Sequence, residues 1–182
     1  IILDLRNNPG GVLNGAIEVS DAFLEKGAIT FTKGRQSDSN QKYFASKKVI
    51  VKTAPLLVLI NEGSASASVL VAGALQDNQR AIFVGMQSFG IGSIQTIHKM
   101  RDNTAFKLTT AFYYTPKGRS IQATGITPDI LVENLSLNAS ANGDTFGEID
   151  LDRHITTKEK SEVRSTDLYF TQLATRDFEL YK

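Results

Sequence analysis

The feature that most restricts the fold is an uninterrupted apolar segment, Leu56 to Ile60, followed closely by a second apolar segment of helical length. Five consecutive apolar residues favour a strand buried on both faces, as in a parallel or mixed sheet. The stretch Gly63–Ser68 then leads into a predicted helix that reaches about Gln79. Because this helix carries little polar surface, we expect it to be buried as well.

The rest of the apolar pattern predicts strands and one more helix around this unit. The helical spacing over residues 12–26 ends at Gly27, a residue type that often follows a helix. We expect residues 34–47 to form a loop and residues 93–100 and 105–114 to form an antiparallel pair. In the second strand of that pair, Phe106, Leu108, Phe112 and Tyr114 share one face. Further strands are predicted at residues 1–5, 28–32, 48–52 and 81–85. Repeated strand–helix–strand order predicts an α/β fold.

The composition changes after residue 133. Residues 1–133 form the predicted core, and residues 134–165 are polar and predict a loop or linker. Residues 166–182 regain apolar side chains and predict a terminal helix that packs on the core.

Size and charge exclude several classes of protein. The 182 residues are most simply one domain, and 20 Lys and Arg against 19 Asp and Glu leave no basic patch for nucleic acid. The absence of cysteine excludes disulfides and thiolate metal sites, and we expect no metal or cofactor. No apolar run approaches the roughly 20 residues that are needed to span a bilayer. The chain opens on the apolar residues Ile1–Leu5 without a starting Met, so we expect a fragment truncated at its N-terminus.

Two clusters of small residues precede predicted helices, Gly10-Gly11 and Ser64-Ala65-Ser66-Ala67-Ser68. Backbone N–H groups at a helix N-terminus are unpaired and favour a developing negative charge. A serine held at a strand-to-helix turn beside such amides is the local arrangement of acyl-transfer enzymes. Serine is also a preferred N-cap, so a purely structural role explains the same pattern. Phosphate binding at the glycines is disfavoured, because no Lys-Ser/Thr pair follows them.

Several motifs, in unbroken order over about residues 1–133, resemble the C-terminal processing peptidases, also called tail-specific proteases. The motifs are Leu3-Asp4-Leu5-Arg6-Asn7-Asn8-Pro9-Gly10-Gly11, Asn61-Glu62-Gly63-Ser64-Ala65-Ser66-Ala67-Ser68, Ala72-Gly73-Ala74-Leu75-Gln76-Asp77-Asn78, Gly92-Ser93-Ile94-Gln95 and Tyr113-Tyr114-Thr115-Pro116-Lys117-Gly118-Arg119.

The resemblance implies a fold similar to crotonase and the Clp protease subunit. It places the nucleophile on Ser66 and the oxyanion donors on the backbone of Ala67 and of Gly10 or Gly11. It implies a lysine base in a Phe-Gly-Lys-Gly motif, oriented by a glutamine that is present here as Gln95. It further implies exposed C-terminal tails as substrates, an upstream PDZ domain and possible homo-oligomers. The location that it implies is periplasmic or otherwise extracytoplasmic, with membrane association as an option.

Two positions depart from the family pattern. The base motif reads Phe89-Gly90-Ile91-Gly92, so isoleucine stands where the family keeps its lysine. Val69 stands where the family usually carries glutamate. The joint loss of two charges favours natural divergence over an engineered change. Isoleucine cannot accept a proton, and a serine hydroxyl is a poor nucleophile until its proton is removed.

Three other side chains could in principle replace the lysine. Lys99 shares the predicted strand of Gln95 but lies about 13 Å further along it. His98 alternates to the opposite face and is expected to be structural or solvent-facing. Lys117 lies in a turn that the sequence does not place.

Three functions remain open at the level of sequence. The first is a serine endopeptidase that cuts at C-terminal tails with a base recruited from elsewhere. The second is a pseudoprotease that binds C-terminal peptides as a scaffold or regulator. The third is a crotonase-like site for an acyl ligand, although no nucleotide or coenzyme motif supports it.

Overall fold

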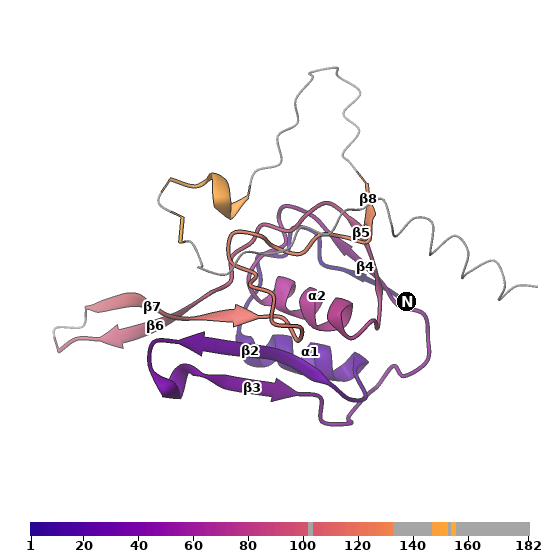
Figure 1. Ribbon diagram of the computed structural model, residues 1–182, viewed down its shortest axis with the longest axis horizontal. Coiled ribbons are helices and arrows are strands. Elements are labelled where there is room, and N and C mark those ends of the chain that lie inside the picture. Colours follow the sequence, from indigo (N-terminus) through magenta and orange to yellow (C-terminus); the bar gives the residue numbers. More distant parts are fainter. Residues whose placement is uncertain (102–103, 133–146, 153, 156–182) are drawn as a thin grey trace, which may run out of the picture.

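The fold consists of two four-stranded sheets with two helices between and beside them (Figure 1). The computed structural model describes residues 1–101, 104–132, 147–152 and 154–155. The first sheet, sheet A, is parallel throughout and has the strand order β1-β4-β5-β8. The second, sheet B, is antiparallel and has the order β3-β2-β7-β6. The α/β class predicted from the sequence is confirmed, with the parallel and antiparallel strands separated into two sheets.

The strands of sheet A are β1 (Ile2–Asp4), β4 (Leu57–Ile60), β5 (Ile82–Gly85) and β8 (Ile130–Leu131). Those of sheet B are β2 (Ala28–Gly34), β3 (Gln41–Phe44), β6 (Ser93–Lys99) and β7 (Ala105–Tyr114).

Helix α2 (Ala67–Asp77) lies in the middle of the molecule, with β2 on one side and β4 and β5 on the other (Figure 1). Nine of its eleven residues are buried, so nearly every face of the helix packs against protein. A helix that is apolar on all sides is stable only in such a position. Gly73 permits a close contact, because a Cβ there would lie 2.9 Å from Cγ2 of Thr115.

Helix α1 (Leu13–Phe23) packs against α2 and ends earlier than predicted. The predicted end was Lys26, before Gly27, whereas the chain leaves the helix at Leu24 with extended backbone angles. Leu24 is 3% exposed and belongs to the core, so burial of this side chain outweighs one further helical turn. Gly27 has a φ of +104° and makes the turn into β2.

Two predictions for residues 34–56 were wrong. The predicted strand at 48–52 is absent, because the N–H groups of Ile50 and Val51 both donate to the carbonyl of Ala22 near the end of α1. The predicted loop at 34–47 instead contains β3, a polar strand on the edge of sheet B that pairs with β2. The pairing of β3 depends on β2 rather than on its own hydrophobic pattern.

The predicted antiparallel pair is confirmed as β6 and β7, which Figure 1 shows as a hairpin extending away from the body of the molecule. Its outer part is solvent-exposed, and Phe106 and Leu108 remain about half exposed. In the described part of the chain, no helix has the length and apolarity needed to cross a membrane.

Part of the predicted linker docks onto the core. The N–H of Glu148, in a short 3₁₀ helix (Glu148–Asp150), donates to the carbonyl of Phe89 at 2.8 Å. The Glu148 carboxylate accepts a hydrogen bond from the side chain of Gln122. The predicted terminal helix at 166–182 lies outside the described residues.

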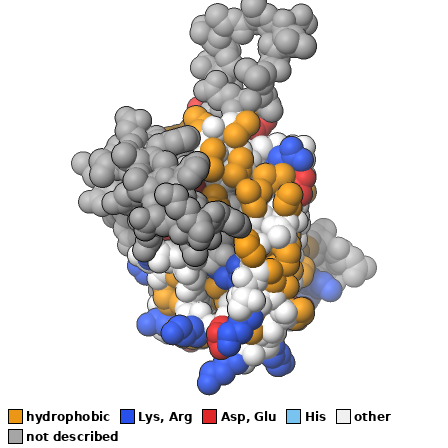
Figure 2. Space-filling model, turned by 90° about the vertical axis from the view of Figure 1, so that its right-hand side faces the viewer, with side chains coloured by type: hydrophobic (Ala, Val, Ile, Leu, Met, Phe, Trp, Pro, Cys, Tyr) orange, Lys and Arg blue, Asp and Glu red, His pale blue; other side chains and the backbone are white. Residues whose placement is uncertain are grey.

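Sheet A leaves apolar side chains accessible, among them Ile2, Ile82 and Leu131. Figure 2 shows apolar side chains gathered in the upper part of one face of the molecule and lysines and arginines toward its lower part.

Candidate active site

Ser66 occupies the turn between strand β4 and helix α2. Its backbone has a φ of +54° and a ψ of −119°, a conformation that is strained for every residue type except glycine. Such a conformation costs about 1–3 kcal/mol and persists only where surrounding contacts impose it. The Ser66 hydroxyl makes no capping hydrogen bond, so the N-cap role considered from the sequence is not the one that it performs.

The neighbouring serines differ from Ser66 because their hydroxyls are bound. The Ser64 hydroxyl donates to the carbonyl of Leu5 at 2.7 Å, and this residue is buried. The Ser68 hydroxyl lies 2.8 Å from the carbonyls of both Asn8 and Ala65. Among the described residues, the Ser66 hydroxyl has no hydrogen-bond partner, and the side chain is partly exposed.

The glycine pair lies directly against this turn. A Cβ on Gly10 would lie 2.6 Å from the carbonyl oxygen of Ala65 and from the amide nitrogen of Ala67, and 2.8 Å from Cβ of Ser66. Gly10 also has a φ of +98°, so only glycine fits here. Tertiary structure therefore brings together two motifs that are more than fifty residues apart in the chain.

The two glycines have different roles. The N–H of Gly10 is already bound, because it donates to Oδ1 of Asn8 at 2.9 Å. Gly11 is exposed, a Cβ added to it would meet no atom within 4 Å, and its N–H has no acceptor within the described ranges. The N–H of Ala67, at the first position of α2, is likewise unpaired there. Within the described residues, the amides left unpaired at this turn are thus those of Gly11 and Ala67.

The loop carrying Ile91 is held by its backbone on both sides. The N–H of Phe89 donates to the carbonyl of Ser64 at 3.0 Å, which joins this loop to the serine turn. The Gly90 carbonyl accepts from Ala123, and the Gly92 N–H donates to Oε1 of Gln122. The position of Ile91 is therefore fixed, and its side chain is partly buried.

Gln95 lies further along the same segment, on β6. The register between β6 and β7 is irregular at Ile94 and Gln95, and the Gln95 side chain is exposed. Its amide has no hydrogen-bond partner in the part of the chain described, so the structure does not join Gln95 to Ser66.

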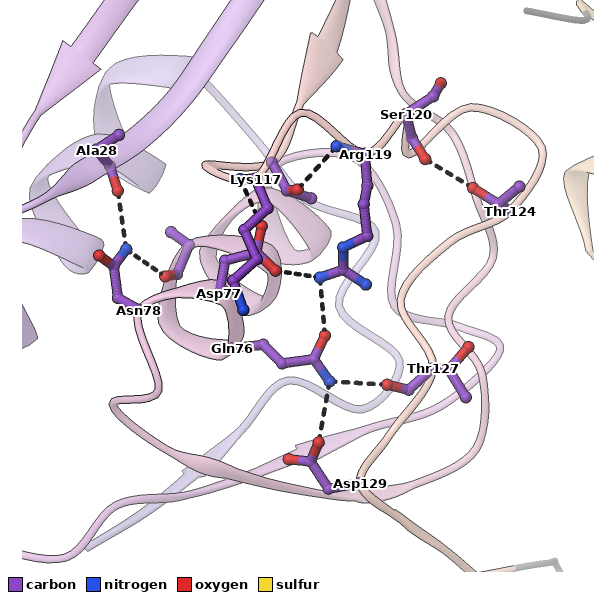
Figure 3. Close-up of polar contacts among 12 residues, drawn as sticks. Ala28, Gln76, Asp77, Asn78, Lys117, Arg119, Ser120, Thr124, Thr127 and Asp129 are labelled. Carbon is purple, nitrogen blue, oxygen red and sulfur yellow. Dashed lines mark hydrogen bonds and ion pairs between the residues drawn. The ribbon is translucent and has the colours of Figure 1, made fainter. Parts of the chain in front are cut away.

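Lys117 lies at the opposite end of α2 from Ser66. Its N–H donates to Oδ2 of Asp77, the last residue of the helix, at 2.8 Å (Figure 3). The ten residue steps from Ala67 to Asp77 span about 15 Å. The sequence alone did not place Lys117, and the structure removes it from the candidate bases.

The two other candidate bases lie on the exposed part of the β6–β7 hairpin. The His98 ring stacks on Phe106 with 4.9 Å between ring centroids, which agrees with the structural or solvent-facing role predicted for it. Lys99 is exposed at the end of β6. Val69, the second departure from the family pattern, is fully buried in the apolar core.

The C-terminal end of α2 carries a polar cluster that the sequence did not reveal. The side chain of Asp77 is 3% exposed and pairs with the guanidinium of Arg119 (Figure 3). The Gln76 amide donates to the carbonyl of Thr127 at 2.9 Å, and the Asn78 amide donates to the carbonyls of Ala28 and Ala74. In the sequence these residues are only parts of a motif, because nothing local pairs residues 76–78 with residues 115–129.

A cavity of about 540 Å³ lies at the carboxyl ends of the strands of sheet A. Its walls include Asp4, Arg6 and Glu62. The Arg6 guanidinium donates two hydrogen bonds to the Asp4 carboxylate, and these bonds lower the pKa of Asp4 to about 2. Within the described residues no group of His, Cys, Asp and Glu could hold a metal ion.

In its described part the chain thus combines an α/β fold with a strained serine at the start of a buried helix, close to unpaired backbone amides, a local arrangement that serine acyl-transfer enzymes also use. Residues 1–132 match the pattern of peptidase family S41, and the chain belongs to this family.

Its relatives include a "Carboxy-terminal-processing protease" of Bartonella bacilliformis, 49% identical over 177 residues, or 97% of this chain and 41% of that protein. A "Carboxyl-terminal-processing protease" of Synechocystis sp. is 45% identical over 132 residues, or 72% of this chain and 30% of that protein. The chain therefore spans less than half the length of these relatives.

A solved structure with the same fold is a photosystem II D1 C-terminal processing protease, with a TM-score of 0.68 and 35% identity over 72% of this chain and 34% of that chain. The mature protease CPAF shares the fold at 17% identity, with a TM-score of 0.58 over 71% of this chain and 38% of that chain.

Proposed function

We propose that this chain is the catalytic region of a serine endopeptidase that cuts proteins at or near exposed C-terminal tails, with Ser66 as the nucleophile. The observation that carries the proposal is the state of Ser66. It is strained, its hydroxyl is free among the described residues, and it lies at the N-terminus of α2 next to the unpaired amides of Gly11 and Ala67. Strain that is retained at a residue with a free nucleophile is typical of active sites.

In the reaction, Oγ of Ser66 attacks the carbonyl carbon of the scissile peptide bond. The carbonyl oxygen becomes an oxyanion and accepts hydrogen bonds from the N–H groups of Gly11 and Ala67. The Ser66 proton passes to a base and then to the leaving amine, and water hydrolyses the resulting ester. Removing one oxyanion donor from such a site typically lowers kcat by about 10²–10³.

The mechanism requires an acceptor for the Ser66 proton. Ile91 stands at the position of the family's lysine, and Lys117, Lys99 and His98 lie away from the start of α2. Loss of the base from such a unit typically costs about 10²–10⁶ in rate. This observation favours a second candidate function, a pseudoprotease that binds C-terminal peptides as a scaffold or regulator.

The cellular setting follows from the family as a further proposal. The substrates are proteins with accessible C-terminal tails, presented by a PDZ domain in the complete protein. The compartment is periplasmic or otherwise extracytoplasmic. The complete protein can also associate with further copies of itself.

The experiment that tests the proposal is cleavage of an unstructured protein by the native protein and by its Ser66→Ala and Ile91→Lys variants. Cleavage by the native protein that disappears in Ser66→Ala supports the peptidase with a base from elsewhere. Cleavage by Ile91→Lys alone identifies a pseudoprotease with an otherwise intact site. If neither the native protein nor Ile91→Lys cleaves, the peptidase proposal is wrong. If Ser66→Ala cleaves as well as its parent, Ser66 is not the nucleophile.

A further inference from the structure

Asn8 is the point at which the glycine loop is attached to the serine turn. Its backbone carbonyl accepts hydrogen bonds from the N–H of Ala65 at 3.0 Å and from the hydroxyl of Ser68 at 2.8 Å. Ala65 and Ser68 flank Ser66 on its two sides, so one carbonyl is bonded to both ends of the strained turn. Pro9 alone separates this attachment from Gly10.

The side chain of Asn8 acts on the other side of Pro9. Its Oδ1 accepts the N–H of Gly10 at 2.9 Å, which is the turn that asparagine forms with the amide two residues later. This bond uses the N–H of Gly10 and leaves that of Gly11 unpaired in the described part of the chain. The amide that is free to bind an oxyanion is therefore selected by the Asn8 side chain.

We infer that Asn8 is a positioning residue for the oxyanion donors, and that Ser68 supports it by holding the Asn8 carbonyl. This inference rests on the proposed function, because it concerns the same site. Asn8 does not touch the reacting atoms. It fixes the distance between the Gly11 and Ala67 amides, which come from segments more than fifty residues apart. Replacing the Asn8 side chain keeps the bonds to the backbone carbonyl but removes the acceptor of the Gly10 N–H, so that Gly10 and Gly11 are then oriented only by packing against Ala65–Ala67.

The other links between the two loops lie upstream and do not reach the glycines. Ser64 binds the carbonyl of Leu5, and the side chains of Asn7 and Asn61 bind each other at 2.9 Å. Both links fix the end of β1, three and one residues before Asn8. Ser64 thus offers a matched control, because its buried hydroxyl joins the same two loops without orienting Gly10.

The test is the rate at which a fluorophosphonate probe labels Ser66. In this reaction Oγ bonds to phosphorus, the P–F bond breaks, the serine proton leaves with fluoride, and the phosphoryl oxygen takes the oxyanion position. Labelling is measured for Asn8→Ala, Asn8→Ser, Ser68→Ala and Ser64→Ala in the native chain and in Ile91→Lys. The limiting rate kinact and the half-saturating concentration KI are determined separately.

We expect Asn8→Ala to lower kinact about 10–100-fold with KI nearly unchanged, because misplacement of an oxyanion donor acts on the transition state. Asn8→Ser should recover most of this loss, since a serine hydroxyl forms the same kind of turn. Ser68→Ala should lower kinact several-fold, whereas Ser64→Ala should lower the unfolding temperature and leave kinact within about twofold, because its bond lies upstream of the glycines.

Equal kinact in Asn8→Ala and its parent, or no recovery in Asn8→Ser, would overturn the inference. If Asn8→Ala does not fold, the comparison of Ser68→Ala with Ser64→Ala tests the inference instead. Equal effects of these two variants on kinact would then overturn it. Failure of the proposed function looks different. In that case neither the native chain nor Ile91→Lys is labelled at Ser66, or Ser66→Ala is labelled as fast as its parent, and the inference fails with it.

Discussion

The two ends of helix α2 differ in whether every polar side chain has a hydrogen-bond partner. At the C-terminal end, the carboxylate of Asp77 and the amides of Gln76 and Asn78 all have partners (Figure 3). At the N-terminal end, Ser66 is strained and its hydroxyl is unpaired within the described residues. Satisfied buried groups stabilise a fold, whereas reactive groups have to remain unsatisfied until a substrate arrives. One helix thus has an end that anchors it and an end suited to chemistry.

The largest effect is expected from Asp77→Ala at the anchored end. This change removes a buried carboxylate that accepts hydrogen bonds from the Arg119 guanidinium and from the N–H of Lys117. Hydrogen bonds to charged groups contribute about 1.5–3 kcal/mol each, so we expect a loss of about 3–5 kcal/mol in the free energy of unfolding. Urea unfolding measures it. Asp4→Ala is the control, because it removes an exposed ion pair with Arg6 and should leave the midpoint almost unchanged. Equal losses of unfolding free energy in Asp77→Ala and Asp4→Ala would show that the C-terminal end of α2 does not anchor the helix.

The next effect is expected from Gly10→Ala at the reactive end. The added Cβ meets backbone atoms of Ala65 and Ala67 and imposes a strained φ, at a cost of about 2–4 kcal/mol. We also expect the labelling of Ser66 to be lost. Gly11→Ala is the matched control for stability, since a Cβ there meets no atom within 4 Å. Labelling of Gly10→Ala at the rate of the native chain would show that the glycine loop does not determine the site.

A smaller effect of opposite sign is expected from Ser66→Gly. Glycine adopts the backbone angles of Ser66 without strain, so we expect a gain of about 1 kcal/mol in stability together with complete loss of labelling. Thermal unfolding measures the gain. Ser68→Gly should instead destabilise the protein, because it removes a buried hydroxyl that is hydrogen-bonded. A lower unfolding temperature for Ser66→Gly would show that the turn is not strained.

The smallest effect is expected from Lys117→Ala. Its backbone N–H is bonded to Asp77 at the anchored end of α2, and the helix spans about 15 Å from there to its start beside Ser66, so the labelling rate should change less than twofold. The same measurement on Lys99→Ala should agree. A tenfold fall in either variant would identify the missing base and remove the pseudoprotease proposal.

The parts of the fold predicted correctly are those with a strong local pattern. The apolar run of β4, the buried helix α2 and the β6–β7 hairpin follow from periodicity and turn residues within each segment. The predictions that failed concern segments whose conformation depends on hydrogen bonds to a part of the chain distant in sequence. Residues 48–52 resemble a strand but bind the end of α1, and β3 is polar yet pairs with β2.

The sequence by itself determined the α/β class, the family, the serine turn at Ser64–Ser68, the glycine pair and the replacement of the base lysine by Ile91. These are properties of residue type and local spacing. Only the tertiary structure decided that Ser66 alone of three serines has a free hydroxyl in the described residues, that Gly11 rather than Gly10 offers its amide, and that Lys117 lies at the wrong end of α2. The physical reason is that hydrogen bonds between segments tens of residues apart decide which polar groups are used and which remain free.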